Sequence, residues 1–466
     1  MQFLVLSDTI CALSTAPGTG AIAVIRISGT ETMRICKTLF QPISKSLDIE
    51  KAPSHTIHLG FLGEGTGILD EVLLSIFRAP NSYTGEDVVE ISCHGSAYIQ
   101  QKILELLFGK GVRLARPGEF TLRAFLNGKF DLSQAEAVAD LIASHSETSH
   151  DLALEQMRGG FSKKIKALRQ KLVDFTSLIE LELDFSEEEV EFADRSALLL
   201  LLQEITAELS HLVRSFSLGN VIKHGIPVAI VGKPNVGKST LLNTILNEEK
   251  AIVSEIPGTT RDAIEDTLII GGYSFRFIDT AGLRGATEDR IESIGIERTW
   301  EKIHEAAVIL YVFDATAQSF NDVMEAIGEF RELAEDKSKK LILVGNKTDK
   351  LKKLPKGFVE FVEYETIFVS AKRKENIHLI AESLQKTVES ANLSDRTIVS
   401  NTRHYEALQS ALNAIEAVNE GLATGLSSDL LTTDIRNALH HLGEITGEIT
   451  TNEILGNIFS RFCIGK

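Results

Sequence analysis

The chain has 466 residues, of which 43% are hydrophobic and 24% are charged, and these values predict a globular protein of two to four domains. The formal net charge of −17 argues against an unspecific nucleic-acid binder, because phosphate binding needs local positive charge, although a local basic patch or a partner protein still allows a nucleic-acid substrate. The four cysteines are scattered without a Cys-x-x-Cys spacing, so they indicate neither a disulfide framework nor a zinc site.

The start of the chain and its most apolar run give no sign of a membrane protein. No basic segment precedes the short apolar run at residues 3–6, so we do not expect a signal peptide. The leucine run at 198–202 is far too short to cross a bilayer. We therefore predict a cytoplasmic protein with no membrane contact.

Residues 1–127 combine strand-like and helix-like periodicity and predict an α/β domain. Strands are expected at 21–27, 71–77 and 88–92, and an amphipathic helix at 98–108. Turn signals such as Pro17-Gly18 and Pro117-Gly118 separate these elements.

Two helical segments, residues 128–220 and 390–466, flank a third region. Apolar residues recur there at spacings of three and four, as in Leu168, Leu172 and Phe175, and this pattern predicts long amphipathic helices. We expect the two segments to pack as one bundle into which the region at 221–389 is inserted. The acidic run at 187–191 is interpreted as a solvated loop or helix start, with a metal site as the alternative.

Residues 232–239 predict a phosphate-binding P-loop. They follow an apolar strand at 226–231 and precede a helix, which is the context that this loop requires. Gly232 and Gly237 allow backbone N–H groups to turn toward phosphate oxygens. Lys238 supplies a cation for the β- and γ-phosphates, and the Ser239 hydroxyl is suited to Mg²⁺.

Downstream strand ends select the base and the metal. Asp349, after the strand at 341–345, can accept hydrogen bonds from N1–H and the 2-amino group of guanine, which adenine lacks. Asp279 ends the strand at 275–278 and is suited to hold Mg²⁺ through water, while Gly282 leaves its N–H for the γ-phosphate. Together these strings predict a Ras-like, doubly wound GTPase domain at 221–389. Residues expected at the nucleotide are Asn235, Val236, Gly237, Lys238, Ser239, Thr240, Asp279, Thr280, Ala281, Gly282, Asn346, Lys347, Asp349, Ser370, Ala371 and Lys372.

Motifs outside the GTPase region, together with one string inside it, resemble the MnmE family, also called TrmE, from end to end. The strings that carry the resemblance are Arg26-Ile27-Ser28-Gly29, Tyr83-Thr84-Gly85-Glu86-Asp87, Arg116-Pro117-Gly118-Glu119-Phe120-Thr121, Arg123-Ala124-Phe125-Leu126-Asn127-Gly128-Lys129, Gln134-Ala135-Glu136-Ala137, Ile256-Pro257-Gly258-Thr259-Thr260-Arg261-Asp262 and Cys463-Ile464-Gly465-Lys466. The resemblance implies a homodimeric tRNA-modifying GTPase that acts with the FAD protein MnmG on C5 of the wobble uridine, producing an aminomethyl or carboxymethylaminomethyl form.

The same resemblance implies a second ligand. The N-terminal domain, residues 1–127, would bind a tetrahydrofolate, either the 5-formyl or the 5,10-methylene form, and mediate dimerisation. The folate contacts implied by the motifs are Arg26, Glu90, Lys129 and Lys466. Without the resemblance, each would be interpreted as a surface salt bridge.

Hydrolysis needs groups that the sequence alone does not supply. Leu283 stands where many small GTPases have a catalytic glutamine, and Arg261 and Arg284 are arginine-finger candidates by charge only. The resemblance implies that Glu292 orients water and that K⁺ replaces an arginine finger. The implied K⁺ ligands are Asn235, Ser254, Ile256 and Thr259; Ser254, Thr259 and Thr260 also join the GTP contacts, and Thr260 completes the Mg²⁺ shell beside Ser239.

Cys463 is a further catalytic hypothesis from the resemblance, because a thiol can attack or protonate C6 of uridine; an inert cysteine is the plainer interpretation. Two other functions remain open: a signalling GTPase, and an RNA-binding or ribosome-assembly GTPase that acts as a nucleotide-controlled switch. The N-terminal domain argues against the first alternative, and the acidic net charge argues against the second.

Overall fold

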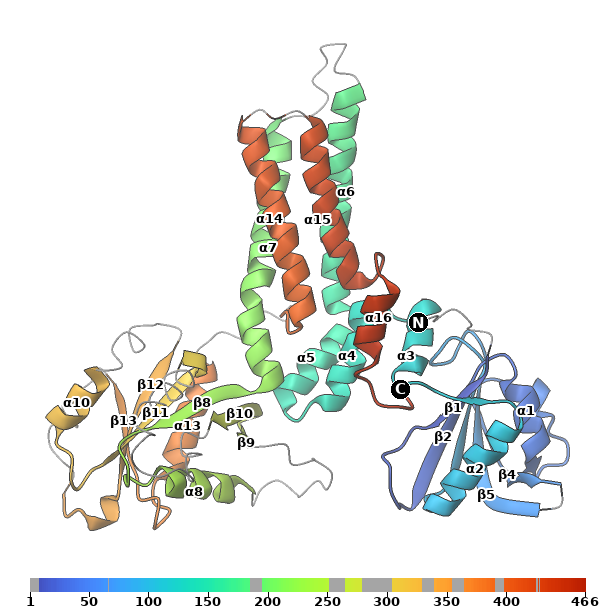
Figure 1. Cartoon of the computed structure of the whole chain (residues 1–466), viewed down its shortest axis with the longest axis horizontal. Coiled ribbons are helices and arrows are strands. Elements are labelled where there is room, and N and C mark those ends of the chain that lie inside the picture. Colours follow the sequence, from blue (N-terminus) through green and yellow to red (C-terminus); the bar gives the residue numbers. More distant parts are fainter. Residues whose placement is uncertain are drawn as a thin grey trace, which may run out of the picture. The chain divides into compact units, whose positions relative to one another are not determined.

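The computed structural model describes residues 8–65, 67–184, 195–250, 265–278, 304–328, 339–353, 364–389, 398–424, 426 and 428–466 (Figure 1). The chain forms two compact units. The first contains residues 1–142, 154–210 and 406–466, and the second contains 143–153 and 211–405. Within the described ranges, every helix is too short or too polar to cross a membrane.

The first unit contains a seven-stranded sheet that confirms the predicted α/β character of the N-terminal region. Its strands are β1 (Ile10–Leu13), β2 (Ile22–Ser28), β3 (Phe40–Pro42), β4 (Thr56–Glu64), β5 (Gly67–Phe77), β6 (Val88–His94) and β7 (Arg113–Leu114), in the order β3-β4-β5-β6-β2-β1-β7. The helical elements are α1 (Thr32–Leu39), η1 (Ile49–Lys51) and α2 (Ala97–Gly109). Neighbouring strands run antiparallel except β1 and β7, which are parallel.

Strand register gives this sheet one buried face and one open face. Ile25, Ile91 and Leu74 lie opposite one another on β2, β6 and β5, and all three are buried in the core that α1 and α2 complete. The neighbouring row carries Arg26 and Glu90, which point to the other face because side chains alternate along a strand. The register therefore places these two predicted ligand residues side by side.

The rest of the first unit is mainly helical, as the apolar periodicity predicted. The helices that lie wholly or partly in it are α3 (Glu119–Leu126), α4 (Leu132–Ala143), α5 (Glu147–Met157), α6 (Gly160–Asp184), α7 (Arg195–His224), α14 (Thr402–Thr424), α15 (Ser428–Thr446) and α16 (Asn452–Phe459). Helix α6 packs along α15, and Lys171 of α6 forms an ion pair with Glu204 of α7. Asn419 of α14 donates a hydrogen bond to the Thr206 hydroxyl of α7 at 3.2 Å. Helices from before and after the GTPase region thus lie together (Figure 1).

Helix α7 ends at the second of two turn signals in the sequence. Gly219-Asn220 and His224-Gly225 were both expected to bound the start of the GTPase domain, and α7 continues through the first pair to His224. A Cβ at Gly219 would lie 2.1 Å from the backbone oxygen of Val399, so this glycine permits a close helix-to-chain contact. The left-handed conformation, with φ of +86°, occurs instead at Gly225, where the helix ends and the next strand begins.

The second unit contains a six-stranded sheet of the predicted doubly wound type. Its strands are β8 (Ile226–Val231), β9 (Glu265–Ile270), β10 (Tyr273–Ile278), β11 (Val308–Asp314), β12 (Lys340–Asn346) and β13 (Glu365–Phe368), in the order β13-β12-β11-β8-β10-β9. All neighbours are parallel except β9 and β10, which form an antiparallel hairpin. Its remaining described helices are α8 (Lys238–Lys250), α10 (Phe320–Gly328), η3 (Thr348–Lys350) and α13 (Ile377–Glu389).

Helices cover both faces of this sheet. Val228 and Ile230 of β8 pack in one core with side chains of α8 and α13, whereas Ala229 and Val231 pack in another core with α10. Because the strands are buried on both sides, they are continuously apolar, as parallel strands usually are. Their carboxyl ends therefore meet at one edge, where a nucleotide binds in folds of this type.

Candidate functional site

The P-loop joins β8 to α8, and two glycines make its course possible. Gly232 has φ of +145°, and a Cβ there would lie 2.0 Å from the backbone oxygen of Val312. Gly237 has φ of +99°, and a Cβ there would lie 2.4 Å from Asn346 Nδ2. A side chain at Gly232 would therefore clash with the neighbouring strand β11, and one at Gly237 would clash with the Asn346 side chain.

Lys238 lies at the first position of α8 and folds back over the loop. Its Nζ donates hydrogen bonds to the backbone oxygens of Gly232 at 2.6 Å and Lys233 at 3.0 Å. This arrangement holds an ammonium group and the amino end of a 13-residue helix on the same side of the loop. Both features favour the binding of an anion.

Asn346, at the end of β12, links the phosphate loop to the base loop. Its Nδ2 donates to the Val236 oxygen at 2.9 Å, and its Oδ1 accepts from the backbone N–H groups of Lys347 at 2.8 Å and Ala371 at 3.0 Å. The side chain is 2% exposed. Sequence analysis predicted Asn346 as a nucleotide contact, and the structure gives it a role in positioning three loops.

Lys347 extends this link through its side chain. Its Nζ donates to the Asn235 backbone oxygen and to Asp314 Oδ2, each at 2.7 Å. Burial opposes the ionisation of Asp314, but hydrogen bonds from Lys347 and Thr316 outweigh it and lower the pKa of this carboxyl group. The aliphatic part of the Lys347 side chain therefore lies beside the P-loop, where it can pack along a planar base.

The Asp349 carboxylate is partly buried, and among the described residues a side-chain donor holds one of its two oxygens. Ser370 Oγ donates to Asp349 Oδ1 at 2.8 Å, and this hydrogen bond lowers the pKa of Asp349. The carboxylate is therefore ionised at neutral pH, with acceptor capacity left for a ligand.

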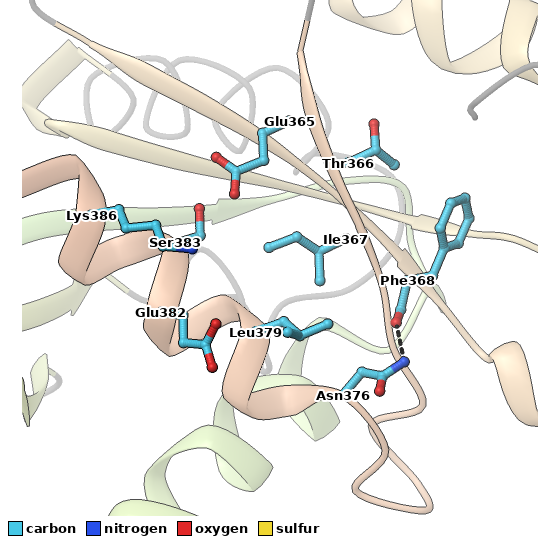
Figure 2. Close-up of a pocket in the computed structure, with 9 residues that line it drawn as sticks. All are labelled: Glu365, Thr366, Ile367, Phe368, Asn376, Leu379, Glu382, Ser383 and Lys386. Atoms are coloured by element: carbon cyan, nitrogen blue, oxygen red, sulfur yellow. Dashed lines mark hydrogen bonds between the residues drawn. The ribbon is translucent and has the colours of Figure 1, made fainter. Parts of the chain in front are cut away.

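The loop that carries Ser370, Ala371 and Lys372 is closed by its own contacts. Ser370 and Glu375 exchange backbone hydrogen bonds at 3.1 Å, and Asn376 Nδ2 donates to the Phe368 oxygen at 3.1 Å (Figure 2). Figure 2 also shows a cavity between β13 and α13 that is lined by none of the predicted GTP contacts. The nucleotide residues instead gather at the strand ends.

Several predicted residues lie outside the described ranges. They are Ser254, Ile256, Thr259, Thr260, Arg261, Asp279, Thr280, Ala281, Gly282, Leu283, Arg284 and Glu292, together with the acidic run at 187–191. Their roles stay predictions. Among the described residues, no group of three or more His, Cys, Asp or Glu side chains could hold a metal ion.

A second cluster occupies the open face of the N-terminal sheet. Arg26 Nε and Nη2 donate to Glu90 Oε1 at 2.9 and 2.7 Å. The guanidinium carbon lies 5.1 Å from the ring centre of Tyr83 and 5.6 Å from that of Phe120, so two aromatic faces flank the cation. Arg26 Nη1 is buried and has no hydrogen-bond partner among the described residues.

The last residues of the chain bind to this domain. The Lys466 oxygen accepts from Phe120 N at 3.2 Å, and the Gly465 oxygen accepts from the Ser14 hydroxyl at 3.3 Å. Burial and then the Arg26 charge lower the pKa of Lys466, against the opposing effects of Glu90 and Cys463. The structure thus brings Lys466 together with Arg26 and Glu90, as the resemblance implied.

Lys129 lies near the cluster of Arg26, Glu90 and Lys466 but is held by a different loop. Its Nζ donates to the Pro80 oxygen at 2.9 Å, on the loop that also carries Tyr83. The next residue, Phe130, meets the Tyr83 ring edge-on with 5.8 Å between centroids. Tyr83 therefore lies between the Arg26 guanidinium and the segment of Lys129.

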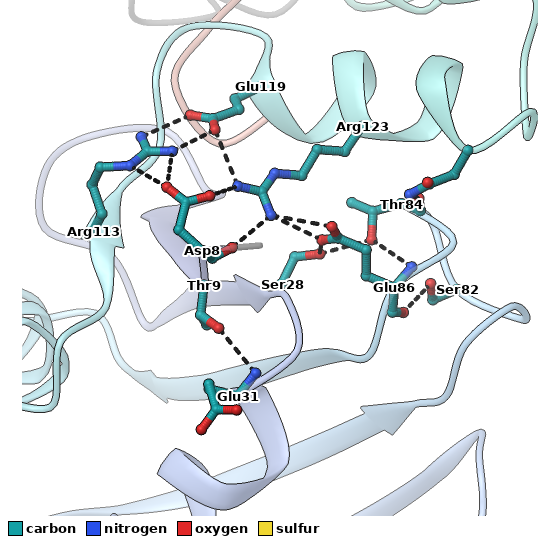
Figure 3. A network of polar contacts seen from close by, with 11 residues as sticks. Asp8, Thr9, Ser28, Glu31, Ser82, Thr84, Glu86, Arg113, Glu119 and Arg123 are labelled. Atoms are coloured by element: carbon teal, nitrogen blue, oxygen red, sulfur yellow. Dashed lines mark hydrogen bonds and ion pairs between the residues drawn. The ribbon is translucent and has the colours of Figure 1, made fainter. Parts of the chain in front are cut away.

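A buried ionic network supports the loop at 82–87, which carries Tyr83 (Figure 3). The Arg123 side chain is fully buried and forms ion pairs with Asp8 at 2.7 Å, Glu86 at 3.1 Å and Glu119 at 3.2 Å. Ser28 donates to Glu86 at 2.7 Å, which connects the network to β2. Since breaking a buried ion pair leaves an uncompensated charge, this network fixes the positions of α3 and of the loop at 82–87.

Sequence analysis missed four residues that complete these sites: Asp314, Tyr83, Phe120 and Arg123. Asp314 ends an apolar parallel strand, the same signal that identified Asn346, and it could have been found. The other three belong to motifs that were recognised, but nothing in their spacing indicates a buried cation or an aromatic pair.

Comparison with known proteins covers nearly the whole chain. The family model for the GTP-binding protein TrmE N-terminus matches residues 9–129, and the model for the MnmE helical domain matches residues 132–463. A protein of Flavobacterium psychrophilum named tRNA modification GTPase MnmE is 55% identical over 99% of this chain and 100% of its own length. Proteins of the same name from Bacteroides fragilis and Cytophaga hutchinsonii are 53% and 51% identical, over 98% and 99% of this chain and 99% and 98% of their own lengths.

Proposed function

This chain belongs to the MnmE family of tRNA modification GTPases, and from that premise we propose that it hydrolyses GTP to drive the modification of C5 of the wobble uridine, position 34, in certain tRNAs. The product is an aminomethyl or carboxymethylaminomethyl uridine, and the FAD protein MnmG is the proposed partner. The observation that carries the proposal is similarity of more than half the residues over the full length of both chains. Chance similarity of one GTPase domain would not extend to the termini.

GTP chemistry is assigned to the edge of the second sheet. Lys238 would bind the β- and γ-phosphates, the Ser239 hydroxyl would hold Mg²⁺, and Asp349 would bind the guanine edge. Mg²⁺ would neutralise charge between the β- and γ-phosphates, and the P-loop fits because the Lys238 ammonium lies against its backbone and α8 begins at this residue. Thr260, Asp279 and Glu292 are proposed to complete the metal shell and to orient water.

The proposed domains are 1–127, 128–220, 221–389 and 390–466, with the GTPase domain inserted into the helical one. Packing of α6 along α15 supports the insertion, because the two helices lie on opposite sides of the GTPase region in the sequence. The complete strand-helix alternation of the inserted region supports it further, since such a region can close its own sheet.

A tetrahydrofolate, as the 5-formyl or 5,10-methylene form, is proposed to bind at Arg26, Glu90, Lys466 and Lys129 and to supply the one-carbon group. The residues fit this ligand. Arg26 offers a buried donor without a partner, and Glu90 Oε2 has no hydrogen bond among the described residues. Tyr83 and Phe120 flank the guanidinium with apolar ring surface, and Lys466 and Lys129 would suit an anionic tail.

Homodimerisation through the N-terminal domain is proposed from the same open face of the sheet. Leu59 and Leu73 lie opposite one another on β4 and β5, with 46% and 44% of each residue exposed, and Ile57 in the next row is 66% exposed. Contiguous exposed apolar residues commonly mark an interaction surface. The row of Ile57 continues through Ser75 to Glu90 and Arg26, so this surface would border the folate site.

Reconstitution tests the proposal as a whole. The full chain, an FAD-containing MnmG, GTP, a 5,10-methylene-tetrahydrofolate, an amine donor and unmodified tRNA should together yield the modified wobble nucleoside in mass spectra. Omission of GTP or of this chain should abolish the product. Product of wild-type yield without the chain would refute the proposal.

The folate assignment makes a separate prediction. Arg26→Ala and Glu90→Ala should each weaken 5-formyl-tetrahydrofolate binding by about ten- to a hundredfold, the expected cost of losing a charged hydrogen-bond partner. GTP hydrolysis should stay close to wild type because the two sites lie in different units. Calorimetry measures the affinity, and Glu71→Ala, a carboxylate removed from β5, is the matched control. Wild-type folate affinity in both variants would remove Arg26 and Glu90 from the site.

A further inference from the structure

The most basic stretch of this acidic chain opens helix α6. Residues 158–171 contain six cations and no Asp or Glu, while the whole chain has a net charge of −17. We call this stretch the basic segment. Its cations are Arg158, Lys163, Lys164, Lys166, Arg169 and Lys171.

Three of these cations, Arg158, Lys163 and Lys166, are exposed, and the other three are partly buried. Phe161, Ile165 and Leu168 are buried on the core side of α6. A charged face on an amphipathic helix is usually solvated and needs no further role. What distinguishes a binding surface from a solvated helix face is therefore how many of the cations have acidic partners within the protein.

Only half of the basic segment is neutralised by its surroundings. Lys166 pairs with Asp131 at 3.1 Å, and Arg169 and Lys171 pair with Glu448 and Glu204. Arg158, Lys163 and Lys164 form no ion pair within the described part of the chain. Three cations without an ion pair among the described residues thus fall within seven residues of a chain whose net charge is −17.

A cavity of about 520 Å³ adjoins this segment. Lys166 lines it together with Lys129 and the aromatic rings of Phe125 and Phe130. Two carboxylates, Asp131 and Glu448, also line it, and they are the ion-pair partners of Lys166 and Arg169. Phe130 contacts Tyr83, which in turn covers Arg26. Two aromatic rings in contact, Phe130 and Tyr83, therefore connect the cavity to the Arg26–Glu90 pair.

We propose that the basic segment binds the sugar–phosphate backbone of tRNA and that the adjoining cavity takes one of its nucleotides. Unpaired cations suit phosphates, and aromatic rings beside them suit a stacked base. A partner protein with an acidic surface would also bind the cations, but it would not need aromatic rings beside them. The aromatic rings, and their contact through Tyr83 with Arg26, therefore favour RNA as the ligand. The inference rests on tRNA being the substrate, as proposed above, and adds where the substrate is held.

The test compares matched charge reversals in the full-length protein. Lys163→Glu with Lys164→Glu changes two lysines that make no ion pair among the described residues, and Lys352→Glu with Lys353→Glu makes the same charge change at two exposed lysines in the second unit. Affinity for an unmodified tRNA transcript is measured over a series of KCl concentrations. The first variant should bind at least about tenfold more weakly and lower the slope of log affinity against log salt by about 1.4 to 1.8, the value for two lost phosphate contacts.

Phe130→Leu tests the cavity separately. It should weaken tRNA binding by about tenfold without changing the salt slope, because stacking releases no counterions. GTP hydrolysis should remain at wild-type rate in all three variants.

The outcomes distinguish failure of the proposed tRNA-binding surface from failure of the proposed tRNA-modifying function. Equal weakening by both lysine pairs, or no weakening by the first pair, would overturn the basic segment as the tRNA surface. Unchanged binding by Phe130→Leu would overturn the nucleotide cavity. Failure of the wild-type protein to modify tRNA in the reconstituted system would instead count against the proposed function.

Discussion

GTP hydrolysis should be about a hundredfold faster in KCl than in NaCl, the size of effect expected when one group that stabilises transition-state charge is removed. Leu283 stands where a catalytic glutamine is common, so another cation and another water-orienting group are needed. Asn235 is the one proposed K⁺ ligand within the described residues. It has φ of +62°, its side chain is exposed, and its backbone oxygen is held by Lys347.

The measurement is the steady-state GTPase rate in the two salts for three proteins. Asn235→Ala should lose the difference between KCl and NaCl while it retains GTP binding. Glu292→Ala should be slow in both salts, because K⁺ does not replace a group that orients water. Equal wild-type rates in KCl and NaCl would eliminate the potassium role, and a fully active Glu292→Ala would eliminate the glutamate role.

Asp349→Asn should weaken GTP binding by about a hundredfold or more and gain affinity for xanthosine triphosphate. In the proposed site the carboxylate would accept hydrogen bonds from guanine donors, whereas an amide at this position can donate to the 2-carbonyl of xanthine. The amide oxygen can still accept the hydrogen bond that Ser370 gives to Asp349 Oδ1, so the loop should keep its conformation.

Both affinities are measured with fluorescent nucleotide analogues, and a melting curve of each protein serves as the folding control. Glu325→Gln, on α10, neutralises a carboxylate away from the predicted contacts. An unchanged preference for guanine in Asp349→Asn would exclude Asp349 from base recognition.

The GTPase sheet and the positions of its site were predictable from sequence because of how parallel sheets are built. Each strand is a continuous apolar run, and the polar residue that ends it, such as Asn346, lies at the common carboxyl edge. Local patterns therefore determine which residues gather. The same logic applies to Asp314, whose pairing with Lys347 depends on two neighbouring strands in the sheet.

Other features depend on contacts between residues far apart in the chain, which periodicity does not report. The continuation of α7 through Gly219 reflects the close approach of Val399, 180 positions later. Likewise, Arg26, Phe120 and Lys466 come from a strand, a helix and the end of the chain. Family resemblance placed Arg26 and Lys466 together, but the aromatic faces around the cation emerged only from the fold.

The distribution of the cysteines offers a reporter for the cluster of Arg26, Glu90 and Lys466, the proposed folate site. Cys11, Cys36 and Cys93 are buried, and burial raises the pKa of their thiols to about 12, 12 and 11. At neutral pH roughly one in ten thousand or fewer of these thiols is ionised, so they react slowly with alkylating reagents. Cys463 is exposed and three residues from Lys466. A maleimide dye added to the unaltered protein should therefore attach at this one position, and its emission would follow the ligand chemistry of the neighbouring residues without any engineered label.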